Sequence, residues 1–408
     1  MSPLTKHTPE ITPDERANLL DEAAQLGKTW EPLGRECDVE NRFPTETVEA
    51  YKQSSITAMS VPKKWGGLGA DMLTAALVGR ELAKGDPSIA LAYNMHQAMV
   101  GIFRNTPALA EDVRESLMRS VAEDRTILCG PFSEARAGLS GLADTVAVPD
   151  PSGGWRISGK KNWSTLVEGA DLIALNATVT DPDGTIPEDF REHARRETCF
   201  VIPKVSEGLT IKHTWDTMGM RATGSHTIVM DGVHASPEMD AGNFRQGLVG
   251  EAEWAAMLFG GVYLGLADKA YAAARDILRE KHLGATLGAQ DTDVKQVGYV
   301  QYLLGKMRSE IEIAERVLEA TGQIAIDGRY EEWPVAVRKA KWDLVKVVCT
   351  EAGMSVTDEA FRLVGGSSFR RGHVIERLYR DARAGFLHSF TTNQLYDFWG
   401  RFELGLMG

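Results

Sequence analysis

The chain has 408 residues, of which 43% are hydrophobic and 25% are charged, so it can form two or three domains around a large core. Its formal net charge of −12 argues against nucleic acid or an anionic membrane as a main partner. The N-terminus lacks the pattern of a secretory signal, and the four cysteines form no CxxC pair. We therefore expect a cytoplasmic protein without a bound metal.

Helical patterns fill the first part of the chain, from Thr12 to about Ser120. The segment Thr12-Pro13-Asp14-Glu15 has the residues of a helix start, with a capping Thr, a Pro in the first turn and acids near the N-terminus. Another predicted helix, Ser88 to Phe103, contains His96. A lone histidine on an apolar helix is usually a core residue whose hydrogen bonds are satisfied.

Between Thr126 and Ser236 the pattern changes to short β-type runs separated by Gly, Pro and Asp. This predicts an all-β middle domain, with an exposed insertion at Pro182 to Arg196. The predicted strands are Arg156–Gly159, Leu172–Thr178, Thr198–Pro203, Leu209–His213 and His226–Asp231.

Helical periodicity returns near Gly250 and predicts an antiparallel bundle of about four helices. The apolar run Trp254 to Ala267 is too short to span a bilayer and indicates a buried helix. The order of patterns predicts an α+β fold with three domains, at residues 1–125, 126–245 and 246–408. The predicted C-terminal helices are Glu253–His282, Val294–Thr321, Val335–Leu363, Ile375–Arg383 and Thr392–Phe402.

The segment Gly159–Thr165 lies between two predicted strands, so we expect Trp163 and Thr165 at the end of a hairpin, on the same side. An aromatic ring beside a hydroxyl group suits a flat heterocycle that needs stacking and one hydrogen bond. The alternative is a core tryptophan and a turn threonine. The sequence has neither a Rossmann glycine fingerprint nor a P-loop, so a nucleotide would bind by other means.

Five segments, in order along nearly the whole chain, resemble motifs of the acyl-CoA dehydrogenase superfamily. Gly159–Thr165 resembles its flavin-facing strand, and Ser133–Gly138 resembles its Thr-Glu-Pro-x-Ala-Gly flavin loop. The others are Val61–Gly69, Met218–Ser225, and Gly365-Gly366 with Glu376–Ala382. The resemblance implies an N-terminal helical domain, a middle β-barrel domain and a C-terminal four-helix bundle, assembled as a homotetramer.

The resemblance also implies a flavin cofactor, FAD or FMN. Residues at the matching positions around the ring are Ser133, Trp163, Thr165, Thr223 and Ser225. Gly365, Gly366 and Asn393 match positions that hold the ADP half of FAD across a subunit interface. The segment Glu280–Gly284 contains no Arg at the position where the family binds the pyrophosphate of FAD. Two alternatives to tightly bound FAD therefore remain: FMN, and reduced flavin supplied by a separate reductase.

Two kinds of flavin chemistry fit this family. A dehydrogenase needs a Glu base nine residues after the Arg that matches Arg380, but that position is Ser389. A minority of these dehydrogenases carry the Glu early in the first bundle helix, where Glu253 lies. Glu253 could instead simply complement the dipole at the helix N-terminus.

The second kind of flavin chemistry is that of the hydroxylase branch of the superfamily, which this sequence also resembles. Thr223-Gly224-Ser225 and the segment Arg383–His388 resemble its motifs, and His96 matches a histidine of its active-site helix. If both resemblances hold, His96 and His388 face one pocket and assist a flavin C4a-hydroperoxide.

We therefore expect a flavin-dependent monooxygenase that acts on a small organic substrate, with His388 and His96 as catalytic residues. The alternative is an acyl-CoA dehydrogenase that uses FAD, with Glu253 as base. A third hypothesis, of a different class, is a catalytically idle scaffold or acyl-carrier-binding protein on this fold.

Overall fold

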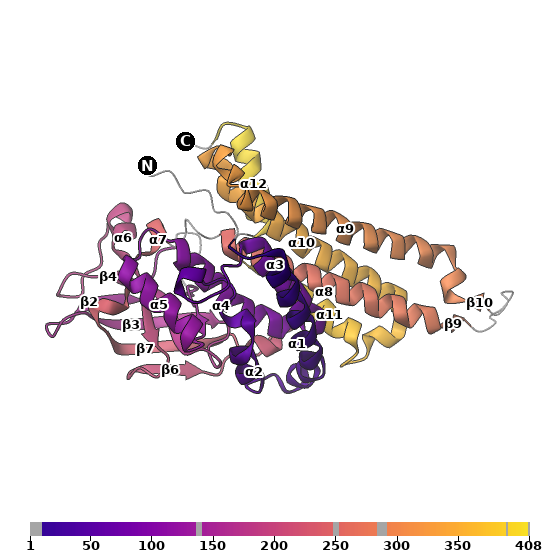
Figure 1. The fold of residues 1–408 in the computed structure, drawn as a ribbon, viewed down its shortest axis with the longest axis horizontal. Coiled ribbons are helices and arrows are strands. Elements are labelled where there is room, and N and C mark those ends of the chain that lie inside the picture. Colours follow the sequence, from indigo (N-terminus) through magenta and orange to yellow (C-terminus); the bar gives the residue numbers. More distant parts are fainter. Residues whose placement is uncertain (1–9, 136–140, 248–252, 284–291, 389–390, 407–408) are drawn as a thin grey trace.

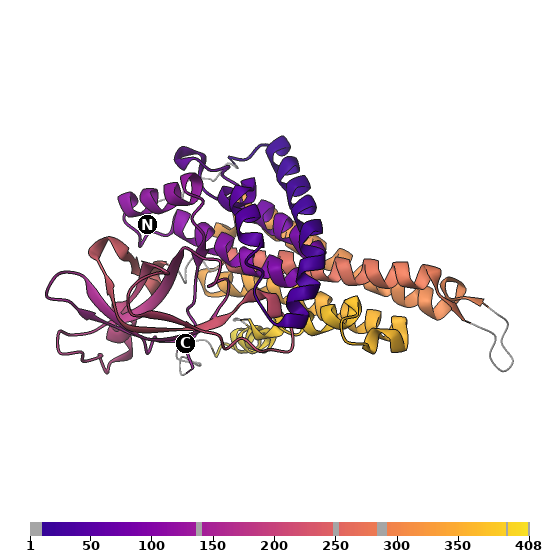
Figure 2. The ribbon, with the colours of Figure 1, turned by 90° about the horizontal axis from the view of Figure 1, so that it is seen from below.

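The structure is a computed structural model that describes residues 10–135, 141–247, 253–283, 292–388 and 391–406. Residues 136–138 of the predicted flavin loop, Gly284 and Ser389 lie outside the described residues. The β domain lies at one end of the molecule, the long C-terminal helices extend to the other end, and N-terminal helices pack against both parts (Figures 1 and 2). None of the described helices is long and apolar enough to cross a membrane.

The N-terminal helices are α1 (Pro13–Glu40), α2 (Thr47–Gln53), α3 (Met72–Gly85), α4 (Pro87–Asn105) and α5 (Glu111–Glu123). The predicted start of α1 is confirmed, because Thr12 and Glu15 form a reciprocal capping box. Asp86 caps α4 by accepting hydrogen bonds from the backbone N–H groups of Ser88 and Ile89.

One sheet forms the middle of the chain, with strand order β6-β7-β3-β2-β4-β5-β8 and β1 paired to β4. The five predicted strands are present, and β1, β2 and β8 are additional. Among the described strands the two ends of the order, β6 and β8, are not paired with each other. The bounds are β1 (Leu128–Cys129), β2 (Val146–Pro149), β3 (Trp155–Ser164), β4 (Leu172–Val179), β5 (Glu197–Pro203), β6 (Leu209–Lys212), β7 (His226–Ala235) and β8 (Asp240–Asn243).

The predicted hairpin between the strands on either side of Trp163 is wrong. Strand β2 lies between β3 and β4, antiparallel to the first and parallel to the second. The predicted insertion between β4 and β5 contains one short helix, α6 (Phe190–Arg196), that has no buried residue.

The C-terminal part consists of α8 (Glu253–Glu280), α9 (Gly298–Ile326), α10 (Val335–Val364), α11 (Val374–Ala382) and α12 (Thr392–Glu403). Helix α8 is the central helix, packed between α3 and α10. A Cβ atom on Gly261 of α8 would lie 2.1 Å from the carbonyl oxygen of Ala76, so glycine allows α3 and α8 to approach closely. The apolar run Trp254–Ala267 is buried along α8, as predicted.

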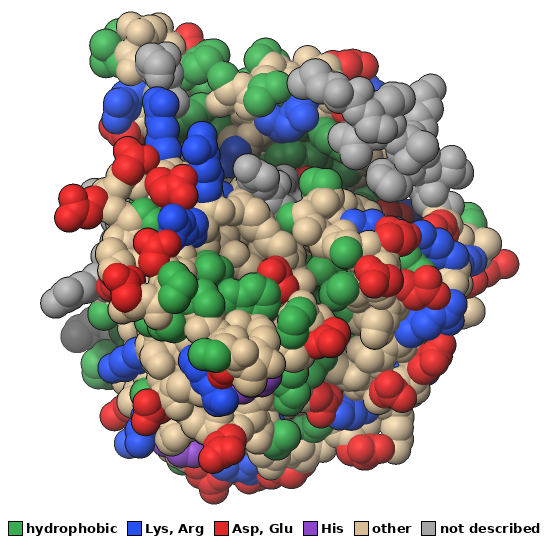
Figure 3. Space-filling model, turned by 90° about the vertical axis from the view of Figure 1, so that its left-hand side faces the viewer, with side chains coloured by type: hydrophobic (Ala, Val, Ile, Leu, Met, Phe, Trp, Pro, Cys, Tyr) green, Lys and Arg blue, Asp and Glu red, His purple; other side chains and the backbone are tan. Residues whose placement is uncertain are grey.

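Charged side chains of both signs are interspersed over the end of the molecule that carries the β domain (Figure 3).

Candidate active site

A chain of three hydroxyl groups joins the loop after β3 to the loop before β7. Thr165 Oγ1 lies 2.8 Å from Ser225 Oγ, which lies 2.7 Å from Thr223 Oγ1. Thr223 Oγ1 donates to the carbonyl oxygen of Met220 at 2.8 Å. The structure therefore brings together three residues that the sequence predicted separately as cofactor-binding.

Trp163 lies next to this hydroxyl chain, at a bulge in β3 where the pairing with β7 shifts between Lys161 and Ser164. Its φ of +57° is in the left-handed region, and its side chain is 52% exposed. Ser133 pairs with Asn162 in an antiparallel bridge, which places Ser133 beside the bulge. An exposed indole ring next to hydroxyl groups fits a flat, polar-edged ring such as a flavin.

A buried ion pair lies directly behind this surface. Lys161 and Glu134, the neighbours of Asn162 and Ser133, form a salt bridge with both side chains almost fully buried. Lys161 also donates to Asn176 Oδ1 at 2.8 Å, and Glu134 accepts from Thr145 Oγ1 at 2.6 Å. The pair holds together the two backbone segments that carry Ser133 and Trp163. The sequence analysis missed it, although both residues lie in the quoted motifs.

His388 lies between helices α8 and α10, just after the short turn that follows α11. Its Nε2 atom is 2.8 Å from the Tyr263 hydroxyl, and its ring stacks on Phe259 with centroids 4.2 Å apart. Lys346 donates to the His388 carbonyl oxygen at 2.8 Å. Burial, with the nearby charge of Lys346, lowers the pKa of His388 to about 3, so the ring is neutral.

The Tyr263 hydroxyl determines which nitrogen of His388 carries the proton. Burial raises the pKa of Tyr263 well above its usual value, so the phenol stays protonated. Among the described residues, its hydroxyl has no acceptor other than His388 Nε2. Tyr263 therefore donates, and the His388 ring carries its own proton on Nδ1.

The hydroxyl chain and His388 are connected through Asp381 at the end of α11. Asp381 Oδ1 accepts a hydrogen bond from the backbone N–H of Met220 at 2.6 Å. Arg380 forms a salt bridge with Asp38 of α1 at 2.6 Å, which fixes α11 to the N-terminal helices. Helix α11 thus positions both the loop that carries Thr223 and the turn that leads to His388.

His96 lies in a different environment. Its Nδ1 accepts from the Leu128 backbone N–H at 3.0 Å, so Nε2 carries the proton and donates to the Thr57 carbonyl oxygen at 2.9 Å. The side chain is fully buried, and burial lowers its pKa to about 4. Both ring nitrogens of His96 are bonded to backbone groups, so His96 is a core residue whose hydrogen bonds are satisfied. These bonds connect α4 to β1.

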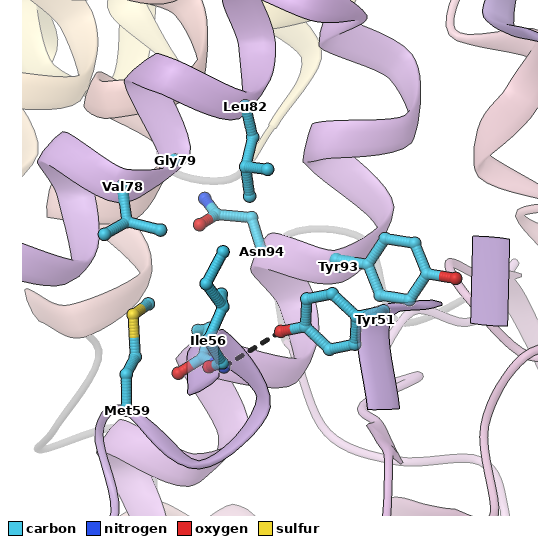
Figure 4. A pocket seen from close by; sticks show the side chains of 9 residues that line it. Tyr51, Ile56, Met59, Val78, Gly79, Leu82, Tyr93 and Asn94 are labelled. Atoms are coloured by element: carbon cyan, nitrogen blue, oxygen red, sulfur yellow. Dashed lines mark hydrogen bonds between the residues drawn. The ribbon is translucent and has the colours of Figure 1, made fainter. Parts of the chain in front are cut away.

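The region around His96 is tightly packed. Tyr51 contacts the His96 ring edge-on and stacks on Tyr93, with centroids 4.0 Å apart. Figure 4 shows the cavity beside these tyrosines, where the dashed line marks a hydrogen bond between Tyr51 and Gln97. The cavity has no space for a water molecule, so it is a small packing gap and offers no substrate site.

The remaining predicted residues lie elsewhere. Glu253 is the first residue of α8, next to the buried Trp254. Gly365 and Gly366 follow α10 beside Lys281, at the end of the bundle away from the β domain (Figure 1). Asn393 is exposed near the start of α12. A single chain therefore does not bring Gly365 and Gly366 to Trp163.

Glu168, His213 and His226 have the residue types of a metal site, and their ligand atoms lie within 4.8 Å of one another. However, His226 Nδ1 accepts from the Trp215 backbone N–H at 3.2 Å, so its Nε2 keeps the proton and faces Glu168 at 3.2 Å. A protonated Nε2 is a hydrogen-bond donor and cannot ligate a metal. The geometry favours a His–Glu hydrogen bond.

Three domain profiles of one family match the chain. The acyl-CoA dehydrogenase N-terminal domain matches residues 13–111, the middle domain 132–233 and the C-terminal domain 257–393.

The curated relatives are of two kinds. A putative acyl-CoA dehydrogenase, YdbM of Bacillus subtilis, is 29% identical over 93% of this chain and 94% of that protein. The amino sugar nitrososynthase DnmZ of Streptomyces peucetius is 26% identical, over 95% of this chain and 93% of that protein. A dibenzothiophene monooxygenase of Mycolicibacterium goodii is 25% identical, over 94% and 93% respectively.

Solved structures of both kinds share the fold. FMN-bound TdsC from Paenibacillus sp. A11-2 aligns with a TM-score of 0.82 at 21% identity, over 95% of this chain and 98% of that one. Butyryl-CoA dehydrogenase from Megasphaera elsdenii aligns with a TM-score of 0.83 at 20% identity, over 96% and 99%. At these identities the likeness shows the fold alone.

Proposed function

The chain belongs to the acyl-CoA dehydrogenase family, and we propose that it is a flavin-dependent monooxygenase that adds one oxygen atom of O₂ to a small organic substrate. The observation that carries the proposal is the neutral His388 held by Tyr263, next to Ser389, where most dehydrogenases of the family carry their Glu base. Serine cannot act as that base. The dibenzothiophene monooxygenase and nitrososynthase relatives support the same function.

The bound flavin, FMN or FAD, would supply the activation of O₂. The chain's own residues hold it: Trp163 offers a ring to stack on, and Ser133 and Thr165 offer polar groups at its edge. The buried pair Glu134–Lys161 keeps these groups in place.

His388 supplies a hydrogen-bond donor to the reacting oxygen. Its Nδ1 carries a proton, and the low pKa keeps the ring neutral at physiological pH. The stacked Phe259 ring limits access of water on one side.

Labelled oxygen tests the proposal. Protein supplied with reduced FMN and ¹⁸O₂ should transfer one labelled atom to an aromatic or amine substrate in a screen of such compounds. Products without label, or oxidation of acyl thioesters to enoyl thioesters, would contradict the proposal.

The alternative, an acyl-CoA dehydrogenase with FAD, rests on Glu253 at the start of α8 and on the 29% identical putative acyl-CoA dehydrogenase. In that case acyl thioesters should reduce the bound flavin without oxygen, and Glu253→Gln should abolish this reduction. Full reduction in the Glu253→Gln variant would exclude Glu253 as the base.

We also propose a homotetramer, with a separate reductase as supplier of flavin. Large apolar side chains are exposed on α9, α10 and α12, among them Tyr302 (70%), Val335 (77%) and Tyr396 (61%). Assembly through these faces would cover them and would let Gly365 and Gly366 reach the flavin of another copy. Sedimentation of a tetramer supports the assembly, and a monomer at micromolar concentration contradicts it.

A further inference from the structure

Two neighbouring helices hold the turn that ends at His388. On α8, Phe259 and Tyr263 are four residues apart and so lie on one face, and both contact the His388 ring. On α10, Lys346 and Thr350 have the same spacing. Lys346 donates to the His388 carbonyl oxygen at 2.8 Å. The ring of His388 is thus held by α8, and its backbone is held by α10.

The turn also packs closely against both helices at Gly385. A Cβ atom on this residue would lie 2.9 Å from Thr350 Cγ2 and 3.1 Å from Tyr263 Cε1, so glycine lets the backbone approach. The position of His388 therefore depends on its contacts with α8 and α10.

Lys346 is buried, with only 1% of its side chain exposed. Removing an ammonium group from water costs free energy, and a neutral donor would avoid that cost. A charge-assisted hydrogen bond is roughly twice as strong as a neutral one, however. Lys346 therefore binds the His388 carbonyl oxygen more firmly than a neutral donor would.

Building on the proposed function, we propose that Lys346 is a positioning residue, which fixes the backbone of His388 and so sets the direction of its Nδ1 donor. Tyr263 holds the Nε2 end of the side chain, at the opposite end of the residue from the carbonyl group. With both ends held, the Nδ1–H bond has one direction. Lys346 acts through His388 and is not itself a reacting group.

The charge of Lys346 can be changed by pH. Burial lowers the pKa of Lys346 to about 8, so the ammonium group loses its proton as pH rises through this value, and its bond to His388 weakens. The nearby charged pair on α10 is Asp343 and Lys339, at 2.7 Å. In this pH range Tyr263 stays protonated and His388 stays neutral, because burial raises the pKa of the first and lowers that of the second.

The contact can be tested in the protein without flavin or substrate. The ¹³C chemical shift of the labelled His388 carbonyl group should change with pH, with a midpoint near the Lys346 pKa of about 8. In Lys346→Arg, which keeps the donor and stays charged, this change should be absent. A wild-type shift that is constant across this range would overturn the inference.

Turnover tests what the contact does. Lys346→Met keeps the length of the side chain but removes its donor, so product formed per O₂ should fall by roughly 30-fold, as loss of a hydrogen bond from a charged group would give. Lys346→Arg should restore most of the yield. In the wild-type protein the yield should also fall as pH rises through about 8, and Lys346→Arg should remove this fall.

Lys269→Met is the matched control. Lys269 is another buried lysine, which donates to the Lys84 carbonyl oxygen at 3.1 Å on the α3 side of α8. Its loss should lower stability and leave product per O₂ unchanged.

Wild-type yield in a folded Lys346→Met variant would overturn the inference. So would an equal loss of yield in Lys269→Met, which would show a general effect of lowered stability. If Lys346→Met does not fold, the wild-type carbonyl titration still decides. A wild-type protein that transfers no oxygen would overturn the proposed function, whereas the titration, which needs no flavin, would still test the Lys346 contact on its own.

Discussion

Two histidines of this protein have lowered pKa values, about 4 for His96 and about 3 for His388, but their ring nitrogens are bonded differently. His96 uses both ring nitrogens on backbone groups of two other segments, Thr57 and Leu128. His388 has one nitrogen bonded to Tyr263, and its Nδ1 has no partner among the described residues. A lowered pKa therefore does not distinguish the two rings. Our proposal assigns the catalytic role to His388 because its Nδ1 has no partner among the described residues and could donate to a substrate.

The largest effect should come from His388→Ala. Loss of the Nδ1 donor should lower product formed per O₂ consumed by roughly 100-fold, within the range for a positioned proton donor, with release of peroxide. Product and peroxide are measured together, and urea denaturation is measured as well, because the substitution leaves the buried Tyr263 hydroxyl without its acceptor. His96→Gln is the control, since loss of a histidine in the core, outside the proposed site, should leave coupling intact. Unchanged product yield would remove His388 from the mechanism.

His96→Ala tests the other half of the comparison. It leaves the Leu128 N–H and the Thr57 carbonyl buried without partners, which should cost about 3 kcal/mol of unfolding free energy. Urea denaturation measures this loss. A folded variant with wild-type stability and impaired turnover would instead place His96 in the reaction.

The pH dependence of stability should report both histidines. The lowered pKa values, about 4 for His96 and about 3 for His388, mean that each ring stays neutral in the fold while the unfolded chain binds a proton below about pH 6.5. Stability is therefore lost as pH falls below 6.5, by up to about 1.4 kcal/mol per pH unit for each ring.

Burial raises the pKa of Asp381 to about 7, which has the opposite sign: its contribution to stability is present at low pH and is lost as pH rises towards 7. Between pH 5 and 6.5, His388→Gln should flatten the dependence of unfolding free energy on pH, and Asp381→Asn should steepen it. Identical slopes in wild type and both variants would show that these protonation states are wrong.

The smallest effect should come from Tyr263→Phe, which removes the hydroxyl and keeps the ring. His388 remains stacked on Phe259 but its proton is no longer restricted to Nδ1. We expect about a tenfold loss of coupling, the value of one hydrogen bond. Nitrogen chemical shifts of labelled His388 should show the Nδ1–H tautomer in wild type and a mixture in the variant. The Nε2–H tautomer in wild type would contradict this assignment.

Periodicity predicted the long helices and five strands because their apolar faces repeat locally. It missed β2, whose four residues end at Pro149 and whose place between β3 and β4 depends on pairing between distant segments. The hairpin prediction failed for the same reason. The bulge at Trp163 was also not predictable, because a non-glycine residue with positive φ carries no composition signal.

The candidate site was predicted as separate residues and not as an arrangement. Thr165, Thr223 and Ser225 were each named, but their order in one hydrogen-bond chain depends on how two loops meet. Tyr263 was missed because its place in the apolar run of α8 is that of a core residue. The hydrogen bond between the Tyr263 hydroxyl and His388 is visible only in the three-dimensional structure.

The central claim is that His388 donates a hydrogen bond to activated oxygen in the flavin-loaded protein. The most direct measurement mixes the protein, loaded with reduced FMN under nitrogen, rapidly with oxygenated buffer and follows the absorption spectrum. We predict a transient spectrum that belongs to neither reduced nor oxidised flavin, with a lifetime shortened in His388→Ala and unchanged in His96→Gln. A direct return to oxidised flavin in the wild-type protein would contradict the account and favour the dehydrogenase.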